Sequence, residues 1–367
     1  MIIRYAISGK RWAKMKIGIV TVFYTENCGS VLQATALSEK LEEFGHEVYF
    51  VSTRNKLSGH SFRRLARNCA KAVKGRKGLR DAVDKFLYYD RYIKSHFNMI
   101  PVESLDMLDR IVIGSDTVWD ITSAYFQESR DIFWMEGTSR LPTITYAASV
   151  ANSSYEQLDE LKYPQKAIES YQAVSVRDQY TYDYVRQSTS KIPTIVCDPT
   201  LLHDKIYYIN KCNMIHSEKY LLLYLFNEPE KDVQVQIKEF AAKHNLRIKA
   251  LVCLGKRISF ADEWVESTIE NFLSYFYQAD FVITNTFHGT VFSVIFNKQF
   301  VVLDYKKVKI NEFLHQTTLQ NRLVDCITEK KLMEEIDYKG VNDRLLGLRE
   351  AGEKFLKVNI GSDEFGE

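Results

Sequence analysis

Short apolar runs rich in β-branched residues alternate with helical patterns along most of this chain. Near its start, the runs KIGIVTVF and EVYFVST flank the segment GSVLQATALSEKLEEFG. The apolar positions of that segment recur at helical spacing from Val31 to Phe44, and Gly45 supplies a stop. A strand, a helix and a second strand in this order predict a βαβ unit, and therefore a parallel sheet covered by helices.

The alternation occurs twice, and this predicts two α/β domains. Further strands of the first half are predicted at RIVIG (110–114), TITYAAS (143–149), AVSVR (173–177) and PTIVCD (193–198). The pattern then restarts with strands at YLLLYLF (220–226), RIKALVCL (247–254), FVITN (281–285) and QFVVLDY (299–305), and with helices across 231–244, near 268–279 and from about 289. Because 367 residues exceed what one core usually organises, we expect domains at 16–210 and 211–335, with a helical tail at 336–367 that packs back across the junction.

Residues 54–100 depart from the alternation and are predicted to form a basic helical insertion. The stretch is dense in Lys and Arg, and Asp81, Asp84 and Asp90 are its only acidic residues. Such a charge run usually faces water as a solvated helical pair; the alternative is a platform for anionic phospholipid or lipid diphosphate headgroups. Segment 54–94 is therefore the candidate for peripheral contact with a membrane.

The overall composition excludes several classes of function. A formal net charge of +2 makes the whole chain neither a nucleic-acid binder nor an acidic protein. Its six cysteines lie far apart without a C-x-x-C pair, so neither a metal site nor a disulfide framework is predicted. No run of about 18 apolar residues and no signal-like leader occurs, so we expect a cytoplasmic protein, with Met15 as an alternative start.

Four turns that follow predicted strands carry polar residues suited to an anionic ligand. They are TENCGSVLQ (25–33), GSDTVWD (114–120), SVRD (175–178) and TNTFHGT (284–290). In open α/β sheets, ligands collect outside the carboxyl ends of the strands, so we expect these turns to share one cleft.

The turn TNTFHGT suggests an anion site at a helix start. A helix beginning near Gly289 leaves its first N–H groups unsatisfied, and Thr286 or Thr290 adds a hydroxyl. His288 is suited to donate a hydrogen bond or a proton near neutral pH; the alternative is a histidine held by a backbone carbonyl. We expect His288 to face the cleft between the domains, within a water's reach of Arg177, rather than to be buried.

The other turns offer a guanidinium and several short polar side chains. Arg177 emerges from a buried strand, where its fork suits a carboxylate or phosphate; the alternative is an ion pair with Asp178 or Asp198. Asp116 follows Gly114 and Ser115, with helix capping as the alternative. No G-x-G-x-x-G, P-loop, G-x-S-x-G or H-E-x-x-H motif is present, and NAD is therefore not expected.

Six stretches together resemble motifs of the polysaccharide pyruvyl transferase family. In chain order they are NCGSVLQATAL, VIGSDTVWD, ITYAAS, VSVRD, CDPTLL and VITNTFHGTVFSVIFNKQF, and they span about residues 16–305. The resemblance implies a fold similar to GT-B glycosyltransferases, with two Rossmann-like domains facing a cleft. It also implies a reaction in which phosphoenolpyruvate gives its pyruvyl group to two hydroxyls of one sugar, forming a cyclic ketal and releasing phosphate.

The resemblance also implies roles for single residues and for partners. His288 corresponds to an acid/base or donor-binding residue, and Arg177 to a contact of the anionic donor. We assign donor binding to Asn285, Thr286, Gly289, Thr290, Ser115 and Asp116, and acceptor binding to Asn27, Gly29, Ser30, Gln33 and Thr117. We expect no cofactor besides phosphoenolpyruvate as co-substrate, and an acceptor hexose or N-acetylhexosamine in a lipid-linked or nucleotide-linked precursor of a surface polysaccharide.

The chain departs from the family pattern at several positions, and two other functions fit the sequence. Thr117, Asp120 and Thr286 replace usual residues, and relatives often read N-S-R where this chain has Asn311, Glu312 and Phe313. The alternatives are a GT-B-like glycosyltransferase that uses a nucleotide sugar and a carbohydrate-binding relative without catalytic activity.

Overall fold

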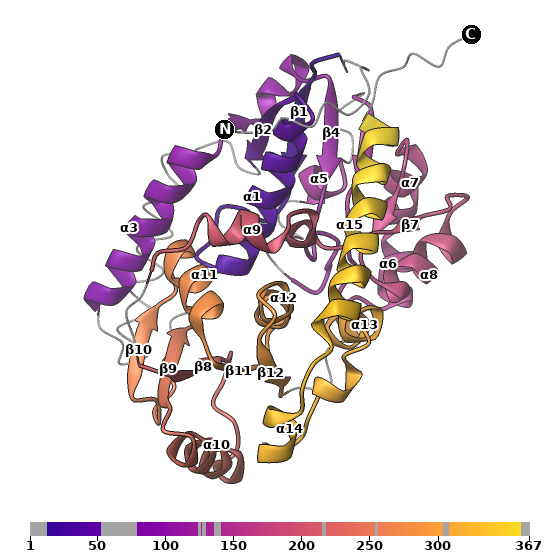
Figure 1. Cartoon of the computed structure of the whole chain (residues 1–367). Helices are drawn as coiled ribbons and strands as arrows, with labels where there is room; N and C mark the ends of the chain where they lie inside the picture. The colour runs from indigo at the N-terminus through magenta and orange to yellow at the C-terminus, as the bar shows by residue number, and fades with distance from the viewer. Residues whose placement is uncertain are drawn as a thin grey trace.

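The computed structural model of the chain describes residues 13–52, 79–123, 126, 130–135, 141–214, 218–253, 256–303 and 308–360. Figure 1 shows two α/β halves, one above the other, each built around a parallel sheet of five strands.

Both sheets have the same strand order. The first runs β3-β2-β1-β4-β5 and the second β10-β9-β8-β11-β12, and every pairing in them is parallel. The strands of the first sheet are β1 (Lys16–Val20), β2 (Glu47–Ser52), β3 (Met99–Pro101), β4 (Arg110–Ile113) and β5 (Thr143–Thr145). Those of the second are β8 (Tyr220–Tyr224), β9 (Arg247–Val252), β10 (Glu263–Glu266), β11 (Phe281–Thr284) and β12 (Gln299–Val302). The predicted strands are confirmed; the edge strands β3 and β10 were not predicted.

A small third sheet and the helices complete the architecture. The strands β6 (Ser175–Val176) and β7 (Thr194–Ile195) form a parallel pair. The longer helices are α1 (Cys28–Glu43), α3 (Leu79–His96), α7 (Tyr163–Ser170), α8 (Gln179–Ser188), α10 (Lys231–Lys243), α11 (Ile269–Gln278), α12 (Phe287–Ile295), α13 (Val308–Gln316) and α15 (Tyr338–Ile360). The shorter ones are α5 (Arg130–Phe133), α6 (Tyr155–Leu161), α9 (Lys205–Ile209), α14 (Glu329–Met333) and the 3-10 turns η1 (Val102–Met107), η2 (Pro199–Leu202) and η3 (Gln320–Arg322).

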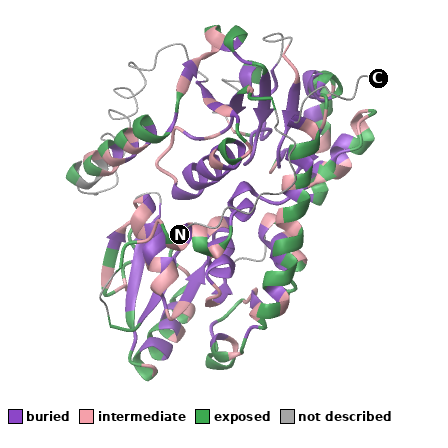
Figure 2. Ribbon diagram, turned by 45° about the horizontal axis from the view of Figure 1, so that its top comes forward, coloured by how far each residue is buried: buried purple, intermediate pink, exposed green. Residues whose placement is uncertain are grey.

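The two halves share a continuous apolar core where they meet. Cys28 and Leu32 of α1 belong to the same buried cluster as Val291 and Phe292 of α12. Figure 2 shows that α1 is buried along most of its length, because the first sheet covers one side and elements near the junction cover the other. The starts of α1 and α12 are therefore held in fixed positions beside each other.

The C-terminal helix α15 runs along both halves (Figure 1). Near its start, the hydroxyl of Tyr338 donates a hydrogen bond to the carbonyl of Lys298 in the second half. Further along, Arg349 donates to the carbonyls of Leu201 and His203 in the first half, at 3.1 and 3.0 Å. The expected limits of the two domains stay predictions.

The predicted basic insertion is described only in part, since residues 53–78 lie outside the described residues. Its last helix, α3, reaches across to the second half. The ammonium of Lys85 donates to the carbonyl of Val252 and to Ser267 Oγ, at 3.4 and 3.3 Å, and the Tyr89 hydroxyl donates to the Ser267 carbonyl at 2.6 Å. This helix therefore links the halves, and contact with a membrane stays a prediction. Among the described helices, none has the length and apolar character needed to cross a bilayer.

Candidate active site

Contacts between their residues bring the four polar turns together, from both halves of the molecule. In each sheet the strand order reverses beside the first strand, between β1 and β4 and between β8 and β11. Ligands of open parallel sheets bind in the crevice at such a switch point. The loops after β1, β4 and β11 therefore bring parts of both halves to one place.

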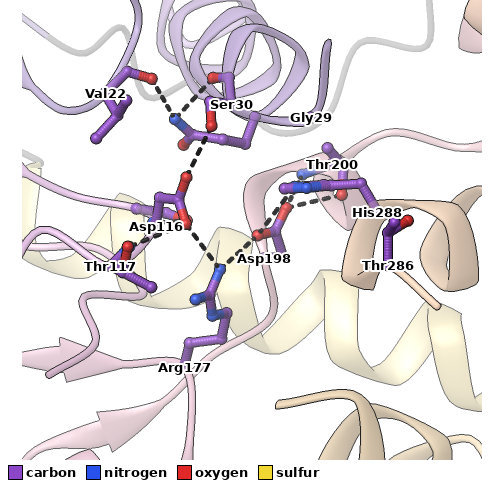
Figure 3. A network of polar contacts seen from close by, with 12 residues as sticks. Val22, Gly29, Ser30, Asp116, Thr117, Arg177, Asp198, Thr200, Thr286 and His288 are labelled. Carbon is purple, nitrogen blue, oxygen red and sulfur yellow. Dashed lines mark hydrogen bonds and ion pairs between the residues drawn. The ribbon is translucent and has the colours of Figure 1, made fainter. Parts of the chain in front are cut away.

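Arg177 follows β6 and points to the middle of this region (Figure 3). Its Nη1 lies 3.2 Å from Oδ2 of Asp198 and 3.9 Å from Oδ1 of Asp116. The residue is only 6% exposed, yet its Nε and Nη2 atoms have no hydrogen-bond partner among the described residues. The ion pair with Asp198 thus occupies one part of the guanidinium and leaves the Nε–Nη2 edge without a partner. Asp178 instead caps α8 by accepting from the Thr181 N–H at 2.7 Å.

His288 is the second residue of α12 and approaches Asp198 from the side opposite to Arg177 (Figure 3). Its Nε2 lies 3.8 Å from Asp198 Oδ2 and has no hydrogen-bond partner in the described part of the chain, so a backbone carbonyl does not hold that nitrogen. Arg177 Nη1 reaches the same oxygen at 3.2 Å, so the two nitrogens are at most 7.0 Å apart. The side chain is only 11% exposed. α1 and Asp198 cover most of the imidazole, so His288 is more enclosed than we expected for a side chain that faces the cleft.

Gly29 provides the cover on the side of α1. A Cβ atom at this position would lie 2.1 Å from Nδ1 of His288, which is far closer than atoms in proteins approach. The first half therefore packs its α1 backbone directly against the imidazole of the second half. Any larger residue at position 29 must displace His288 or separate the two helix starts.

At the start of α12, several polar groups of the turn TNTFHGT bind one another. The hydroxyl of Thr286 accepts a hydrogen bond from the Gly289 N–H at 2.9 Å and lies 3.1 Å from that of Thr284. The Thr290 hydroxyl donates to the Thr286 carbonyl at 2.9 Å. Asn285 also serves the turn, because its Oδ1 accepts from the N–H of residue 226. These four residues thus build the turn that carries His288, and their assignment to donor binding stays a prediction.

Asp116 lies in a strained turn after β4. Its φ of 75° is in the left-handed region, which Asp adopts more readily than most residues. Its carboxylate accepts from Ser30 Oγ at 3.0 Å and from the Thr117 N–H at 2.9 Å, so it closes a turn and caps no helix. Ser115 is completely buried beneath it. The structure thus joins α1 to the β4 turn and places Asp116 next to Arg177.

Of the residues assigned to acceptor binding, Asn27 and Gln33 bind groups near the start of α1, whereas Ser30 and Thr117 lie next to Asp116. Asn27 caps α1 by accepting from the Gly29 N–H at 3.1 Å. Gln33 is completely buried, and its amide donates to Thr21 Oγ1 and to the carbonyls of residues 22 and 30. Positioning of the loop fits Gln33 better than the expected acceptor contact. Ser30 is bound to Asp116, and half-buried Thr117 lies beside it.

Two charged residues of the site were not assigned from the sequence. Asp198 was considered only as an ion-pair partner of Arg177. In the structure it contacts both Arg177 and His288. It also caps η2 by accepting from the N–H and hydroxyl of Thr200 at 3.1 and 2.7 Å. The CDPTLL motif contained it. Glu312 was noted only as a departure from a family pattern. Its Oε1 accepts from the Gln179 N–H at 3.0 Å, and no sequence signal indicated this contact between the halves.

The charges set the protonation states of the site. Burial alone would raise the pKa of Asp116, but Arg177, Lys309 and His288 outweigh it and lower the pKa. Burial lowers the pKa of His288, although Asp198 and Asp116 act in the opposite direction. At neutral pH, the site therefore contains an ionised Asp116 and a neutral imidazole that can accept a proton.

Solved structures with the same architecture share little sequence with this chain. A UDP-N-acetylglucosamine 2-epimerase matches with a TM-score of 0.57 and 10% identity, over 96% of this chain and 98% of that chain. The enzyme from Neisseria meningitidis, bound to UDP-GlcNAc, gives 0.53 and 11%, over 94% and 100%. The enzyme from Methanocaldococcus jannaschii gives 0.52 and 10%, over 94% and 99%. These likenesses confirm the GT-B-like arrangement of two Rossmann-like halves and carry no statement about activity.

Comparison at the level of sequence is more specific. No curated protein sequence matches the chain significantly. The profile of the family described as polysaccharide pyruvyl transferase matches residues 27–307, which is more than half of the chain and includes Arg177, Asp198 and His288. The chain therefore belongs to the polysaccharide pyruvyl transferase family and is a transferase.

Proposed function

We propose that the protein transfers the pyruvyl group of phosphoenolpyruvate to two hydroxyls of one sugar, forming a cyclic ketal and releasing phosphate. The acceptor is a hexose or N-acetylhexosamine in a lipid-linked or nucleotide-linked precursor of a surface polysaccharide. The observation that carries this proposal is the buried guanidinium of Arg177, whose Nε–Nη2 edge has no partner among the described residues.

A carboxylate is the group that this edge fits best. The two N–H groups of a guanidinium edge match the two oxygens of a carboxylate, and the pairing is strongest away from water. A buried cation with unsatisfied donors is costly, so a ligand that supplies both acceptors stabilises the arrangement. Phosphoenolpyruvate has such a carboxylate. Lys309 adds positive charge nearby, since its Nζ and the Arg177 Cζ lie 5.5 and 5.0 Å from the centre of the Phe287 ring.

The reaction also needs a group that moves protons, and His288 is suited to this role. Each of the two sugar hydroxyls loses one proton; one proton goes to the methylene carbon C3 of the donor and the other leaves with phosphate. Two C–O bonds form at C2 and the C2–O bond to phosphate breaks. The neutral imidazole of His288 can accept a hydroxyl proton. Its Nε2 lies at most 7.0 Å from Arg177 Nη1, which allows both side chains to reach one small donor.

The direct test is to incubate the purified protein with phosphoenolpyruvate and a panel of lipid-linked and nucleotide-linked sugars. We expect phosphate release together with the mass gain of one pyruvyl ketal on at least one acceptor. His315→Ala, at an exposed histidine of α13, is the control that should keep this activity. Phosphate release without the ketal mass, or neither signal with any acceptor, would contradict the proposal.

Ligand binding separates the two alternative functions. Phosphoenolpyruvate should raise the melting temperature of the protein in a thermal-shift assay, because a ligand that binds only the folded state stabilises it. A shift with UDP-sugars alone and transfer of the sugar itself would favour a glycosyltransferase. A separation of more than about 10 Å between Arg177 and His288, too far for one small donor, would have favoured the carbohydrate-binding alternative; their nitrogens are at most 7.0 Å apart.

A further inference from the structure

Glu312 lies where the second half meets the start of α8, and one of its oxygens is unsatisfied. Its Oε1 accepts from the Gln179 N–H at 3.0 Å. Its Oε2 is buried and has no hydrogen-bond partner within the described ranges. An ionised carboxylate with one oxygen in this state is costly, whereas the un-ionised acid or a bound ligand would relieve it.

One contact of Glu312 and one contact of its helix neighbour Lys309 place this side chain beside the site. Gln179 follows Arg177 by two residues, so the hydrogen bond fixes Glu312 next to the turn that carries the guanidinium. Lys309 precedes Glu312 by three residues on α13 and therefore shares its face of the helix. That lysine and Arg177 both lie against the Phe287 ring, and Phe287 immediately precedes His288.

We propose that Glu312 is the second proton-carrying residue of the site and that, as the un-ionised acid, it protonates the methylene carbon C3 of the enol phosphate. The assignment rests on the proposed pyruvyl transfer. In this role Glu312 complements His288, which accepts protons from the sugar.

The charges around Glu312 favour the un-ionised form. Burial raises its pKa to about 7, and Asp178 adds to this, whereas the Gln179 N–H and Arg177 act in the opposite direction. Asp183 of α8 also raises the pKa of Glu312 and so favours the un-ionised acid. On α13 itself, the other charged or titratable side chains are Lys309 and His315. The pKa of His288 is lowered, so near neutral pH the site contains Glu312 as an acid and His288 as a base. General acid–base catalysis requires one group of each kind.

The protons balance over the two bond-forming steps. In the first, Glu312 gives its proton to C3 while a sugar hydroxyl attacks C2 and its proton passes to His288. In the second, the other hydroxyl attacks C2 as the bond to the phosphate oxygen breaks. The imidazolium then gives its proton to the leaving phosphate, and the proton of the second hydroxyl restores the acid on Glu312. No oxidant, reductant or metal is needed.

The test uses Glu312→Gln in the full chain, because Gln keeps an oxygen that can accept from the Gln179 N–H but cannot supply a proton. We expect kcat to fall by roughly 10²- to 10⁴-fold with little change in KM for phosphoenolpyruvate. In the wild type, kcat should fall as the pH rises through about 7, where Glu312 ionises, and the residual activity of the variant should lack this limb. The control is Asp183→Asn, which removes a neighbouring negative charge and should move the limb to lower pH while keeping the maximal rate.

A second readout does not depend on turnover. Infrared difference spectra of the wild type between pH 6 and 8 should contain the carbonyl band of an un-ionised carboxylic acid that Glu312→Gln abolishes, and both proteins should melt cooperatively. If that band is absent, or if Glu312→Gln is as active as the wild type with the same pH profile, the proposal is wrong while pyruvyl transfer stands. A wild type that turns over no acceptor overturns the proposed function and this proposal together.

Discussion

The two halves contribute to the site in opposite ways. In the second half, the turn before α12 is closed on itself: Thr284, Thr286 and Gly289 bind one another, and one functional side chain, His288, projects from it. In the first half, Arg177 keeps an edge of its guanidinium without a partner among the described residues, although it is buried. Under the proposed function, the second half would supply a rigidly held proton carrier, and the first half the guanidinium that binds the donor carboxylate.

The largest effect is expected from removing the proton carrier. His288→Ala should lower kcat by roughly 10²- to 10⁴-fold. Folding should remain nearly intact, because Nε2 makes no hydrogen bond to the described residues that would be lost. Pyruvyl transfer and a melting curve are measured on the same samples, with His315→Ala as the control. An unfolded variant, or one with wild-type turnover, would contradict the catalytic role.

The next largest effect should come from disturbing the contact between the halves. Gly29→Ala places a Cβ 2.1 Å from His288 Nδ1, so the imidazole must move. A displacement of this kind should reduce kcat by about 10²-fold. The matched control is Gly347→Ala, also in a helix, where a Cβ would meet nothing within 4 Å. Equal activity of the two variants would show that the position of His288 is not critical.

A smaller effect, on binding, is expected at Arg177. Arg177→Lys keeps the positive charge but replaces the fork by a single ammonium group. We expect KM for phosphoenolpyruvate to rise by about 10- to 100-fold with a smaller change in kcat, because a charge-assisted hydrogen bond is lost. Steady-state kinetics at a saturating acceptor measure both constants. An unchanged KM would assign donor binding to another part of the site.

The closed turn of the second half gives a prediction about stability. Thr286→Val removes the cap of α12 and should lower the free energy of unfolding by about 1 kcal/mol. Since the Thr286 hydroxyl is bound to the Gly289 N–H, we expect it not to contact the donor and KM for phosphoenolpyruvate to stay the same. Thr328→Val, which removes the cap of α14, is the matched control for stability. A large rise in KM for Thr286→Val alone would support the anion site at the helix start.

The smallest effect concerns the pH dependence of stability. Because burial lowers the pKa of His288, the unfolded chain takes up a proton at higher pH than the folded protein does. The stability linked to His288 is therefore present above its unfolded pKa of about 6.5 and is lost as the pH falls below it. Denaturant unfolding at pH 8 and 5.5 should show a smaller loss for His288→Gln than for the wild type. An identical loss would indicate that the histidine ionises equally in both states.

The fold followed from local patterns in the sequence. Strands such as β1 and β8 are short apolar runs next to amphipathic helices, and this pattern is readable without tertiary information. The edge strands β3 (MIP) and β10 (EWVE) were not predicted, because they contain a proline and two glutamates, which are residue types depleted in strands. The cap at Thr286 was readable in principle, because Thr is a common N-cap, and it explains why α12 begins two residues before Gly289.

The site was only partly readable because its contacts join distant segments. Arg177 and His288 were identified, but the burial of His288 depends on Gly29 and Asp198, which come from other parts of the chain. The contact between Glu312 and Gln179 joins residues 133 positions apart. A pattern of residue types shows which chemical groups the side chains carry, but it does not show which partners they bind in the fold. Those partners decide which atoms remain available to a ligand.

The most direct test of the central claim is an experimental structure of the protein with phosphoenolpyruvate bound. We expect the donor carboxylate to lie against Nε and Nη2 of Arg177 at hydrogen-bond distance, with His288 beside the enol carbons and the Thr286 cap intact. A donor bound at the start of α12 with its phosphate on the Gly289 N–H, or bound away from Arg177, would contradict the account.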